Sequence, residues 1–435
     1  MNLYCLCILL IFSYQPSEVS LHSYEAFDHL GTRTPYRFKS NKDDTIIKYP
    51  GCQPKKIWMM IRHGTRNPGP EDIKGMNTTL NNLKYTILTQ HKNGKGNLTL
   101  DQISDFKDWS NRLDLGKGKL LVLEGQEEMI LLAERTKKRF PGILKNKYNN
   151  KTFLFRYTAT ERTQQSARYF ANGLFSQKEA KDVIFAPATQ VDTVLRFYKH
   201  CDKWQKQVKK NPHTYKEYKR FAISQQMNKT LERVSKTLGL TNVLSVDQVK
   251  LMFKVCGFET AWNKYFPSPW CAAFDEESAE VMEYLFDLKD YWINGYGLEL
   301  TYRQACLSIK NMFENLSHKK KPKAMFLFSH SGTVLKIISH LGLYKPESHL
   351  TADNFDKSRP WKTSNIDCFA ANLAFVLFDC QGRDHVLALH QEHIIKMPSC
   401  DSELCPLDRL TQHYRDSILD CDYEDMCKLH RKDDL

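Results

Sequence analysis

The sequence predicts an α/β fold in which a helical region is inserted into a domain built around a sheet. Short apolar segments typical of buried strands occur at 57–61 and 153–155, and again near the other end of the chain at 324–328, 373–378 and 386–390. Between the two groups, residues 179–310 show helical patterns rich in charged and aromatic side chains and no clean strand. This arrangement indicates a sheet flanked by helices with an α-helical cap.

We therefore divide the chain into a signal peptide (1–20), an α/β domain formed by 21–178 and 311–435, and a helical insertion or cap (179–310). Apolar residues at helical spacing predict several helices, and Thr160 is a plausible N-cap for one of them. Helices are predicted at 70–90, 120–139 and 161–170, and two more stand out in the insertion, at 277–293 and 302–316.

The chain is basic. Its 435 residues contain 63 Lys and Arg against 50 Asp and Glu, which gives a formal net charge of +13. Such a charge suits a polyanionic substrate, a nucleic acid or an anionic membrane surface, and a solvated basic surface explains it equally well. No nucleic-acid-binding motif accompanies the Lys-rich stretches at 206–210 and 319–321, so we do not expect a nucleic-acid partner.

Both ends of the chain carry targeting features. Residues 3–14 are apolar but too few to span a bilayer, and polar residues follow, as in a secretory signal peptide. No other stretch resembles a transmembrane segment. The last four residues, Lys432-Asp433-Asp434-Leu435, resemble the Lys-Asp-Glu-Leu retention signal. We expect a protein of the endoplasmic reticulum lumen, bound by a retention receptor through these residues, or a secreted protein if the signal is weak.

Eleven cysteines follow the predicted signal peptide. In the secretory pathway they favour disulfides, and their odd number leaves at least one unpaired. No Cys-x-x-Cys pair or His cluster suggests zinc. Sequons for N-glycosylation occur at Asn77, Asn97, Asn150, Asn228 and Asn315.

The most informative stretch is the heptapeptide Arg62-His63-Gly64-Thr65-Arg66-Asn67-Pro68, directly after the apolar segment 57–61. An imidazole is a competent nucleophile. Guanidinium groups on either side can hold a phosphoryl group by paired, charge-assisted hydrogen bonds, and Gly64 allows the backbone to approach a ligand closely. The heptapeptide therefore predicts that His63 attacks phosphorus while Arg62 and Arg66 neutralise charge.

Two further segments end predicted strands. Arg156 follows 153–155, and His330 follows 324–328 at the start of an apolar helix, whose N-terminus can bind an anion. Because open α/β sheets build sites at the carboxyl ends of their strands, we expect both residues beside His63. Arg156 in a surface ion pair and His330 in a structural role are the alternatives. Arg62, Thr65, Arg66 and Arg156 would bind the phosphoryl group, with no need for a metal or other cofactor.

The heptapeptide resembles the signature of the histidine phosphatase superfamily, in its acid phosphatase and phytase branch. Segments within 256–275, 283–297 and 371–380 resemble multiple inositol polyphosphate phosphatases, so the resemblance covers roughly Cys52 to the C-terminus. It implies the phosphoglycerate mutase-like sheet of that superfamily and a phosphohistidine at His63. The implied substrates are inositol hexakisphosphate and lower inositol polyphosphates, with 2,3-bisphosphoglycerate as a further candidate.

The resemblance also implies the disulfides Cys52–Cys380, Cys256–Cys271 and Cys400–Cys405. Cys201 has two candidate partners, Cys421 and Cys427.

The chain departs from the family pattern at one position. Members carry an acid after the second histidine, as His-Ala-Glu or His-Asp, whereas this chain has His330-Ser331-Gly332. The residue expected to protonate the leaving group is thus a glycine. Two functions remain: a phosphomonoesterase on inositol polyphosphates, of reduced activity, or a catalytically impaired member that binds them.

Overall fold

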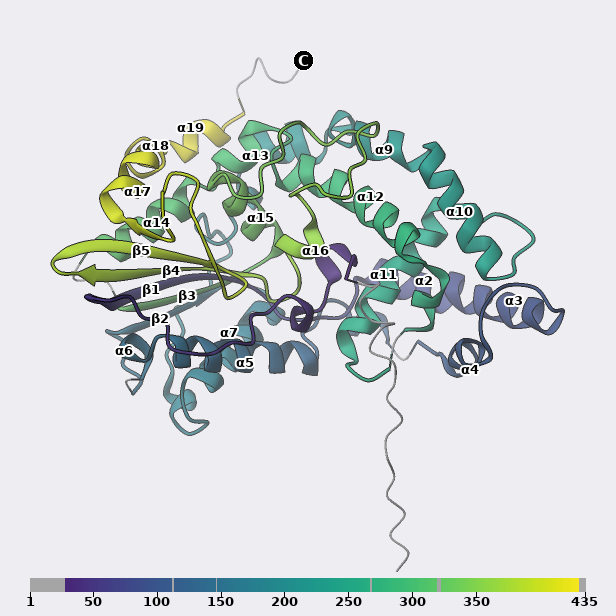
Figure 1. Ribbon diagram of the computed structural model, residues 1–435, viewed down its shortest axis with the longest axis horizontal. Helices are drawn as coiled ribbons and strands as arrows, with labels where there is room; N and C mark the ends of the chain where they lie inside the picture. Colours follow the sequence, from purple (N-terminus) through teal and green to yellow (C-terminus); the bar gives the residue numbers. More distant parts are fainter. Residues whose placement is uncertain (1–27, 112, 146, 267, 319–321, 430–435) are drawn as a thin grey trace, which may run out of the picture.

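A seven-stranded mixed sheet forms the centre of one half of the molecule (Figure 1). Its strand order is β2-β3-β1-β4-β5-β6, with β7 paired to β5; β1, β2 and β3 are parallel, and β4 is antiparallel to β1. The strands are β1 (Cys52–Arg62), β2 (Phe153–Tyr157), β3 (Ala324–Ser329), β4 (Asn372–Cys380), β5 (Arg383–His390), β6 (His393–Ile395) and β7 (Leu404–Pro406).

This computed structural model describes residues 28–111, 113–145, 147–266, 268–318 and 322–429. The predicted signal peptide and the terminal tetrapeptide lie outside these residues. The predicted α/β class and all five predicted strands are confirmed. The sequence did not predict β6 and β7, which have three residues each.

Alternating side chains of β1 point to opposite faces of the sheet and join two cores. Ile57, Met59 and Ile61 pack in one core, and Trp58 and Met60 in the other. Figure 1 shows α5 (Leu123–Arg139), α6 (Pro141–Leu144) and α7 (Glu161–Leu174) on one face, and α14 (Cys306–Ser317), α15 (Ser331–His340), α17 (Leu407–His413) and α18 (Arg415–Leu419) on the other. The sheet is therefore the middle layer of three.

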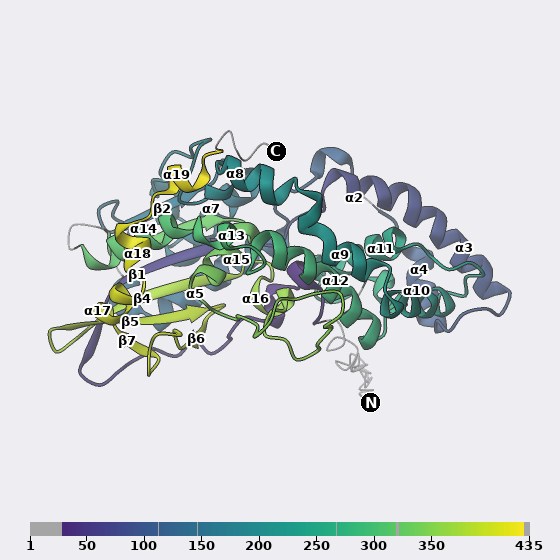
Figure 2. The ribbon, with the colours of Figure 1, turned by 90° about the horizontal axis from the view of Figure 1, so that it is seen from above.

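The other half of the molecule is helical (Figures 1 and 2). It contains α2 (Pro70–Gly75), α3 (Asn81–Lys92), α4 (Leu100–Asp108), α9 (Lys216–Ala222), α10 (Gln225–Thr237), α11 (Val246–Trp262) and α12 (Glu276–Asn294). Helices α2 to α4 precede β2, so this half includes residues that the sequence assigned to the α/β domain. Polar contacts join them to α11: Lys254 Nζ lies 2.8 Å from Asp72 Oδ1, and Trp109 Nε1 donates to Glu259 Oε1 at 2.7 Å.

Two predicted helices are each interrupted. A π-helical turn at Met76–Leu80 separates α2 from α3, and the helix predicted at 302–316 is split into α13 (Glu299–Arg303) and α14. The remaining α-helices are short: α8 (Asp202–Trp204), α16 (Thr363–Ile366) and α19 (Tyr423–Cys427). Within the described residues, no helix is long and apolar enough to cross a membrane.

Five disulfides form within the described residues. Three are the pairs implied by the resemblance, and the others join Cys201 to Cys427 and Cys306 to Cys421. Cys368 is free and buried.

The sequons differ in exposure. Asn77, Asn97, Asn150 and Asn228 are exposed. Asn315 is 1% exposed, and its amide donates to the Pro322 carbonyl at 3.1 Å. The folded protein has no room for a glycan there, which corrects the prediction at this position.

Candidate active site

The carboxyl ends of β1, β2 and β3 lie at one edge of the sheet. Arg62 is paired with Ser329, and Tyr157 with Phe328, so the residues that follow all three strands meet there. The rings of His63 and His330 are 5.5 Å apart between centroids. The structure thus brings together the two histidines that the sequence singled out.

His63 is held in its neutral form. Its ring is buried, and its Nδ1 lies 2.9 Å from the Gly64 carbonyl oxygen. Because a carbonyl only accepts, Nδ1 carries the hydrogen and Nε2 keeps its lone pair. Burial, followed by the charges of Arg162, Arg62, Arg66 and His330, lowers the pKa of His63 well below its usual value. The imidazole therefore stays unprotonated at physiological pH.

The loop after His63 is fixed by close backbone packing. A Cβ on Gly64 would lie 2.4 Å from the Gly125 carbonyl oxygen, and a Cβ on Gly125 would lie 2.2 Å from the Thr65 carbonyl oxygen. The Gly64 N–H donates to Ser166 Oγ of α7 at 3.1 Å. Both glycines are needed because any side chain would push the loop away from α5.

Thr65 has a different role from the one predicted. Its N–H donates to Glu128 Oε2 at 2.7 Å and its hydroxyl to Oε1 at 2.8 Å, and it is fully buried. Burial raises the pKa of Glu128 to about 7, against the opposing effect of these hydrogen bonds. Thr65 therefore braces the loop against α5, and we no longer assign it to phosphate binding.

The two arginines of the heptapeptide differ in how many backbone carbonyls hold their side chains. Nη1 of Arg62 donates to the carbonyls of Thr32, Asp367 and Cys368 at 2.8, 2.5 and 3.0 Å. Arg66 donates to the Asn67 carbonyl at 2.7 Å. Burial first, then repulsion from neighbouring arginines, lowers the pKa of Arg66 to about 9. An anion at this position would relieve that repulsion.

The third arginine at the site is Arg162, a residue that the sequence analysis missed. Arg156 is half-buried, and its Nη2 forms a 3.0 Å ion pair with Asp192. Arg162 lies in the first turn of α7, and its Nη2 is 3.2 Å from Nδ1 of His330. It is also the first charge that lowers the pKa of both histidines. The available signal was its place at the start of a helix that follows a strand.

His330 is engaged at both ring nitrogens. Arg162 donates to Nδ1, so Nε2 carries the hydrogen and donates to Thr158 Oγ1 at 2.9 Å. Burial and four arginines (Arg162, Arg196, Arg66 and Arg62) hold the pKa of His330 well below its usual value. His330 is therefore neutral in the absence of an anion.

Further cations extend this positive charge. Arg33 lies over the Phe286 ring at 4.7 Å and adds to the repulsion at Arg66 and at Lys254 of α11. On the other side, Arg196 repels Lys199 and Arg162. Within the described residues, no carboxylate pairs with Arg33, Arg66, Arg162 or Arg196. No motif pointed to Arg33 or Arg196, which lie outside the segments that the sequence analysis singled out.

Gly332 faces polar and aromatic side chains. A Cβ there would lie 3.3 Å from Asn294 Oδ1 and 3.4 Å from Tyr198. Asn294 donates to Asp290 Oδ1 at 2.9 Å, and its own Oδ1 accepts from Lys336 Nζ at 2.6 Å. A larger side chain at position 332 thus requires neighbours to move by a few tenths of an ångström.

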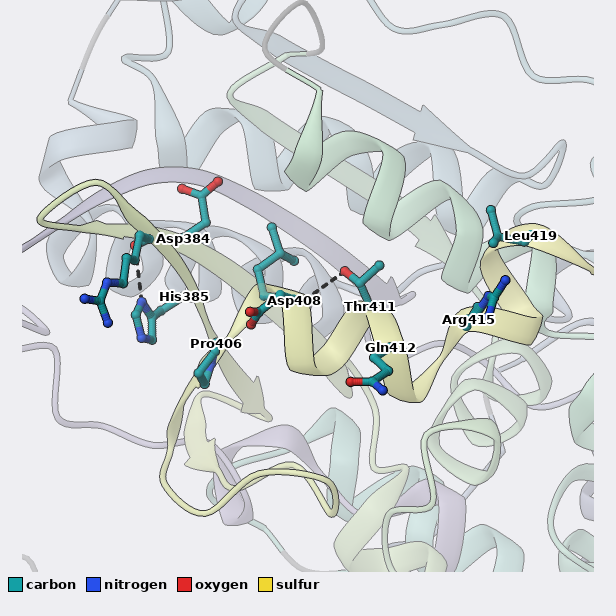
Figure 3. Close-up of a pocket in the computed structure, with 10 residues that line it drawn as sticks. Asp384, His385, Pro406, Asp408, Thr411, Gln412, Arg415 and Leu419 are labelled. Atoms are coloured by element: carbon teal, nitrogen blue, oxygen red, sulfur yellow. Dashed lines mark hydrogen bonds between the residues drawn. The ribbon is translucent and has the colours of Figure 1, made fainter.

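A pocket of about 850 Å³ lies elsewhere, between β5, β7, α17 and α18 (Figure 3). Its wall includes the first residues of β5, Arg383, Asp384 and His385. The other end of β5 pairs with the part of β4 that lies beside the end of β1, near Arg62. The pocket is therefore at the opposite end of the sheet and contributes no group to the histidine site.

Comparisons with known proteins agree with this geometry. The family model described as histidine phosphatase superfamily (branch 2) matches residues 55–396. A Drosophila melanogaster protein named multiple inositol polyphosphate phosphatase 1 is 31% identical over 90% of this chain and 85% of its own. The Homo sapiens protein of the same name is 28% identical over 87% of this chain and 82% of its own.

Solved structures share the fold. The phytase from D. castellii superimposes with a TM-score of 0.75 at 18% identity, over 96% of this chain and 90% of the phytase. The Bifidobacterium longum multiple inositol polyphosphate phosphatase, in complex with inositol hexasulfate, gives a TM-score of 0.68 at 14% identity, over 89% and 97% of the two chains. With the family model matching most of its length, this chain belongs to the histidine phosphatase superfamily, branch 2.

Proposed function

We propose that the chain is a phosphomonoesterase that removes phosphate from inositol hexakisphosphate and lower inositol polyphosphates through a phosphohistidine at His63. The observation that carries this proposal is the excess of positive charge around a neutral, buried histidine. Arg62, Arg66 and Arg162 are sufficient for one phosphoryl group, and Arg33, Arg196 and Lys254 extend the charge beyond it. A substrate with several phosphates can contact all of these cations. A smaller candidate substrate with two phosphates is 2,3-bisphosphoglycerate.

The first chemical step follows from the tautomer of His63. Nε2 attacks phosphorus, the P–N bond forms, and the bond to the ester oxygen breaks. The arginines stabilise the charge that develops on the phosphoryl oxygens. In the second step, water attacks the phosphohistidine and inorganic phosphate is released, which restores the lone pair on Nε2.

His330 changes its role when the anion binds. A phosphoryl group that binds Arg162 draws its guanidinium away from Nδ1 of His330. The negative charge of the phosphoryl group also offsets the arginines that lower the pKa of His330. His330 then becomes a donor to a phosphoryl oxygen. This proposal needs no metal ion for charge neutralisation.

The test is phosphate release from inositol hexakisphosphate by the purified protein, with rapid-quench trapping of labelled phosphate on His63. We expect release and a labelled histidine that is acid-labile. Gly332 favours the second candidate, a binding protein of low activity. Tight binding of inositol hexakisphosphate without phosphate release would support that candidate and overturn the enzyme.

We further propose that the protein resides in the endoplasmic reticulum lumen, retained through Lys432–Leu435. Five disulfides fit an oxidising compartment. Deleting residues 433–435 should increase secretion into the medium, measured by immunoblot. An unchanged distribution would leave the tetrapeptide without a role in retention.

A further inference from the structure

The proposed reaction lacks an evident proton donor for the leaving group. Cleavage of an inositol phosphate expels an alkoxide, a strong base that must receive a proton as the P–O bond breaks. Gly332 has no side chain to supply it. The donor must therefore come from another residue near the start of α15.

Asp367 and Asp290 contact residues beside position 332, namely Ser331 and Asn294. Asp367 follows α16, and Asp290 lies in α12. Asp290 is half-buried and is hydrogen-bonded by Asn294. Asp367 is fully buried and accepts a hydrogen bond at Oδ2 from the hydroxyl of Ser331, the residue between His330 and Gly332. Only Asp367 is connected to the catalytic segment by a hydroxyl group that can carry a proton.

The surroundings of Asp367 suit a carboxyl group that gains and loses a proton. Its Oδ1 is buried and has no hydrogen-bond partner. Arg62 Nη1 lies 3.6 Å from Oδ2, close enough to stabilise the carboxylate after the proton has left. Ser331 is half-buried, so its hydroxyl borders the site rather than the core.

From this geometry we infer that Ser331 protonates the leaving oxygen and that Asp367, acting through Ser331, is the source of the proton. This inference rests on the proposed function. When Asp367 is protonated, the hydrogen bond to Ser331 reverses: the carboxyl donates to Ser331 Oγ, and the Ser331 hydroxyl is free to donate to the ester oxygen. As the ester bond breaks, its electron pair goes to the ester oxygen, which takes the Ser331 hydroxyl hydrogen while Ser331 takes the proton of the Asp367 carboxyl. In the second step, the attacking water returns a proton through Ser331 to the Asp367 carboxylate, so the cycle closes without another reactant.

The proton is available in the pH range that matters. Burial raises the pKa of Asp367 to about 7, with a contribution from Asp290, while Arg62 and the Ser331 hydroxyl oppose the shift. These are the charged and polar groups that face it, from β1, α12 and α15. The relay needs the protonated carboxyl, so activity on inositol phosphates should decline as pH rises through about 7.

The experiment compares two substrates on the full chain: inositol hexakisphosphate and p-nitrophenyl phosphate, whose leaving group needs no proton. Ser331→Ala should reduce kcat on inositol hexakisphosphate by about 10²-fold or more, the usual contribution of a positioned acid. It should change kcat on p-nitrophenyl phosphate by less than about threefold, because Asp367 keeps its proton when this leaving group departs and the proton of the attacking water then passes to solvent. Inhibition by inorganic phosphate should be unchanged. Asp367→Asn should show the same substrate pattern and lose the decline near pH 7.

Asp290→Asn is the matched control. It should keep the acid-side rates on both substrates and move the alkaline decline to lower pH, because Asp290 raises the pKa of Asp367. Ser331→Thr retains a hydroxyl group and should recover much of the lost rate. Melting curves identify any variant that fails to fold. If Asp367→Asn does not fold, Ser331→Ala alone tests the relay.

The failures of the two proposals look different. If the wild type releases phosphate from inositol hexakisphosphate and Ser331→Ala keeps that rate, the relay is overturned and the function stands. Equal losses on both substrates, or a selective loss in Asp290→Asn instead, overturn the relay too. If the wild type cleaves only p-nitrophenyl phosphate, or neither substrate, both proposals fail.

Discussion

In the proposed reaction the site has two sides, one that holds the phosphoryl group and one that protonates the leaving group, and they differ in construction. On the phosphate side, His63, Arg62 and Gly64 are fixed by backbone carbonyls, by α5 and by α7. On the leaving-group side, α15 begins with a serine and a glycine, and the carboxyl group that contacts this serine comes from the segment after α16. The phosphate side keeps every residue that the motif requires, whereas the other side has lost its expected acid.

This difference reflects what each side must do. Holding a phosphoryl group in line with Nε2 requires several groups in one fixed geometry, so a single change disrupts it. Delivering a proton requires only one acidic group within reach, directly or through a hydroxyl. We therefore expect substitutions on the phosphate side to affect all substrates alike, and those on the other side to depend on the leaving group.

The largest effect should come from His63→Ala. Removing a nucleophile typically reduces kcat by a factor on the order of 10⁶. The variant should lose activity on inositol hexakisphosphate and on p-nitrophenyl phosphate to the same extent, while its melting temperature stays near that of the wild type. Substantial activity in a folded His63→Ala protein would rule out the phosphohistidine.

Arg162→Ala and Arg156→Ala separate the arginine at the site from the one that the motif suggested. Arg162→Ala should lower kcat/KM by about 10² to 10³ on both substrates, as for loss of one preorganised charge donor. Arg156→Ala removes an ion pair with Asp192 and should change kcat/KM by less than about threefold. A larger loss of kcat/KM in Arg156→Ala than in Arg162→Ala would mean that Arg156 binds phosphate.

Gly332→Glu tests whether the leaving-group side accepts a direct acid. In the Ser331→Ala background, a carboxyl at position 332 should raise the rate on inositol hexakisphosphate by about 10-fold or more and leave p-nitrophenyl phosphate nearly unchanged. Asn294 and Tyr198 must first yield slightly to the new side chain. Equal gains on both substrates would mean that the glutamate acts on the phosphate side.

The smallest effect concerns Glu128, whose pKa burial raises to about 7, as it does for Asp367. A carboxyl with a raised pKa in the folded state stabilises the protein below its unfolded pKa of about 4.5, and this stabilisation is lost as pH rises through about 7. Glu128→Gln should therefore flatten the decline in melting temperature between pH 5 and 7 by a few degrees. Unlike Asp367→Asn, it should leave the alkaline decline in activity in place.

Local patterns were enough to predict the strands and to single out His63 as a residue of the candidate site. The five apolar runs are buried strands, and the heptapeptide after β1 is at the site, because both depend on neighbouring residues. Arg162 was missed because the second residue of α7 reaches the site, whereas Arg156 near the end of β2 forms an ion pair with Asp192.

Asp367 could not have been found from the sequence. Its link to Ser331 spans 36 positions and depends on how the segment after α16 packs against α15. Thr65 shows the converse, since a residue inside the motif faces Glu128, 63 positions away.

The position of β1 in the sheet affects how the protein is made. Its two neighbours, β3 and β4, begin at Ala324 and Asn372, so the ribosome has completed most of the chain before either can pair with it. Until then the apolar residues 57–61 have no strand to pair with, and an unpaired apolar segment invites aggregation and chaperone binding in the nascent chain. His63 is thus among the first residues synthesised and among the last to reach its working position, and a nascent chain that stops before residue 372 should be inactive.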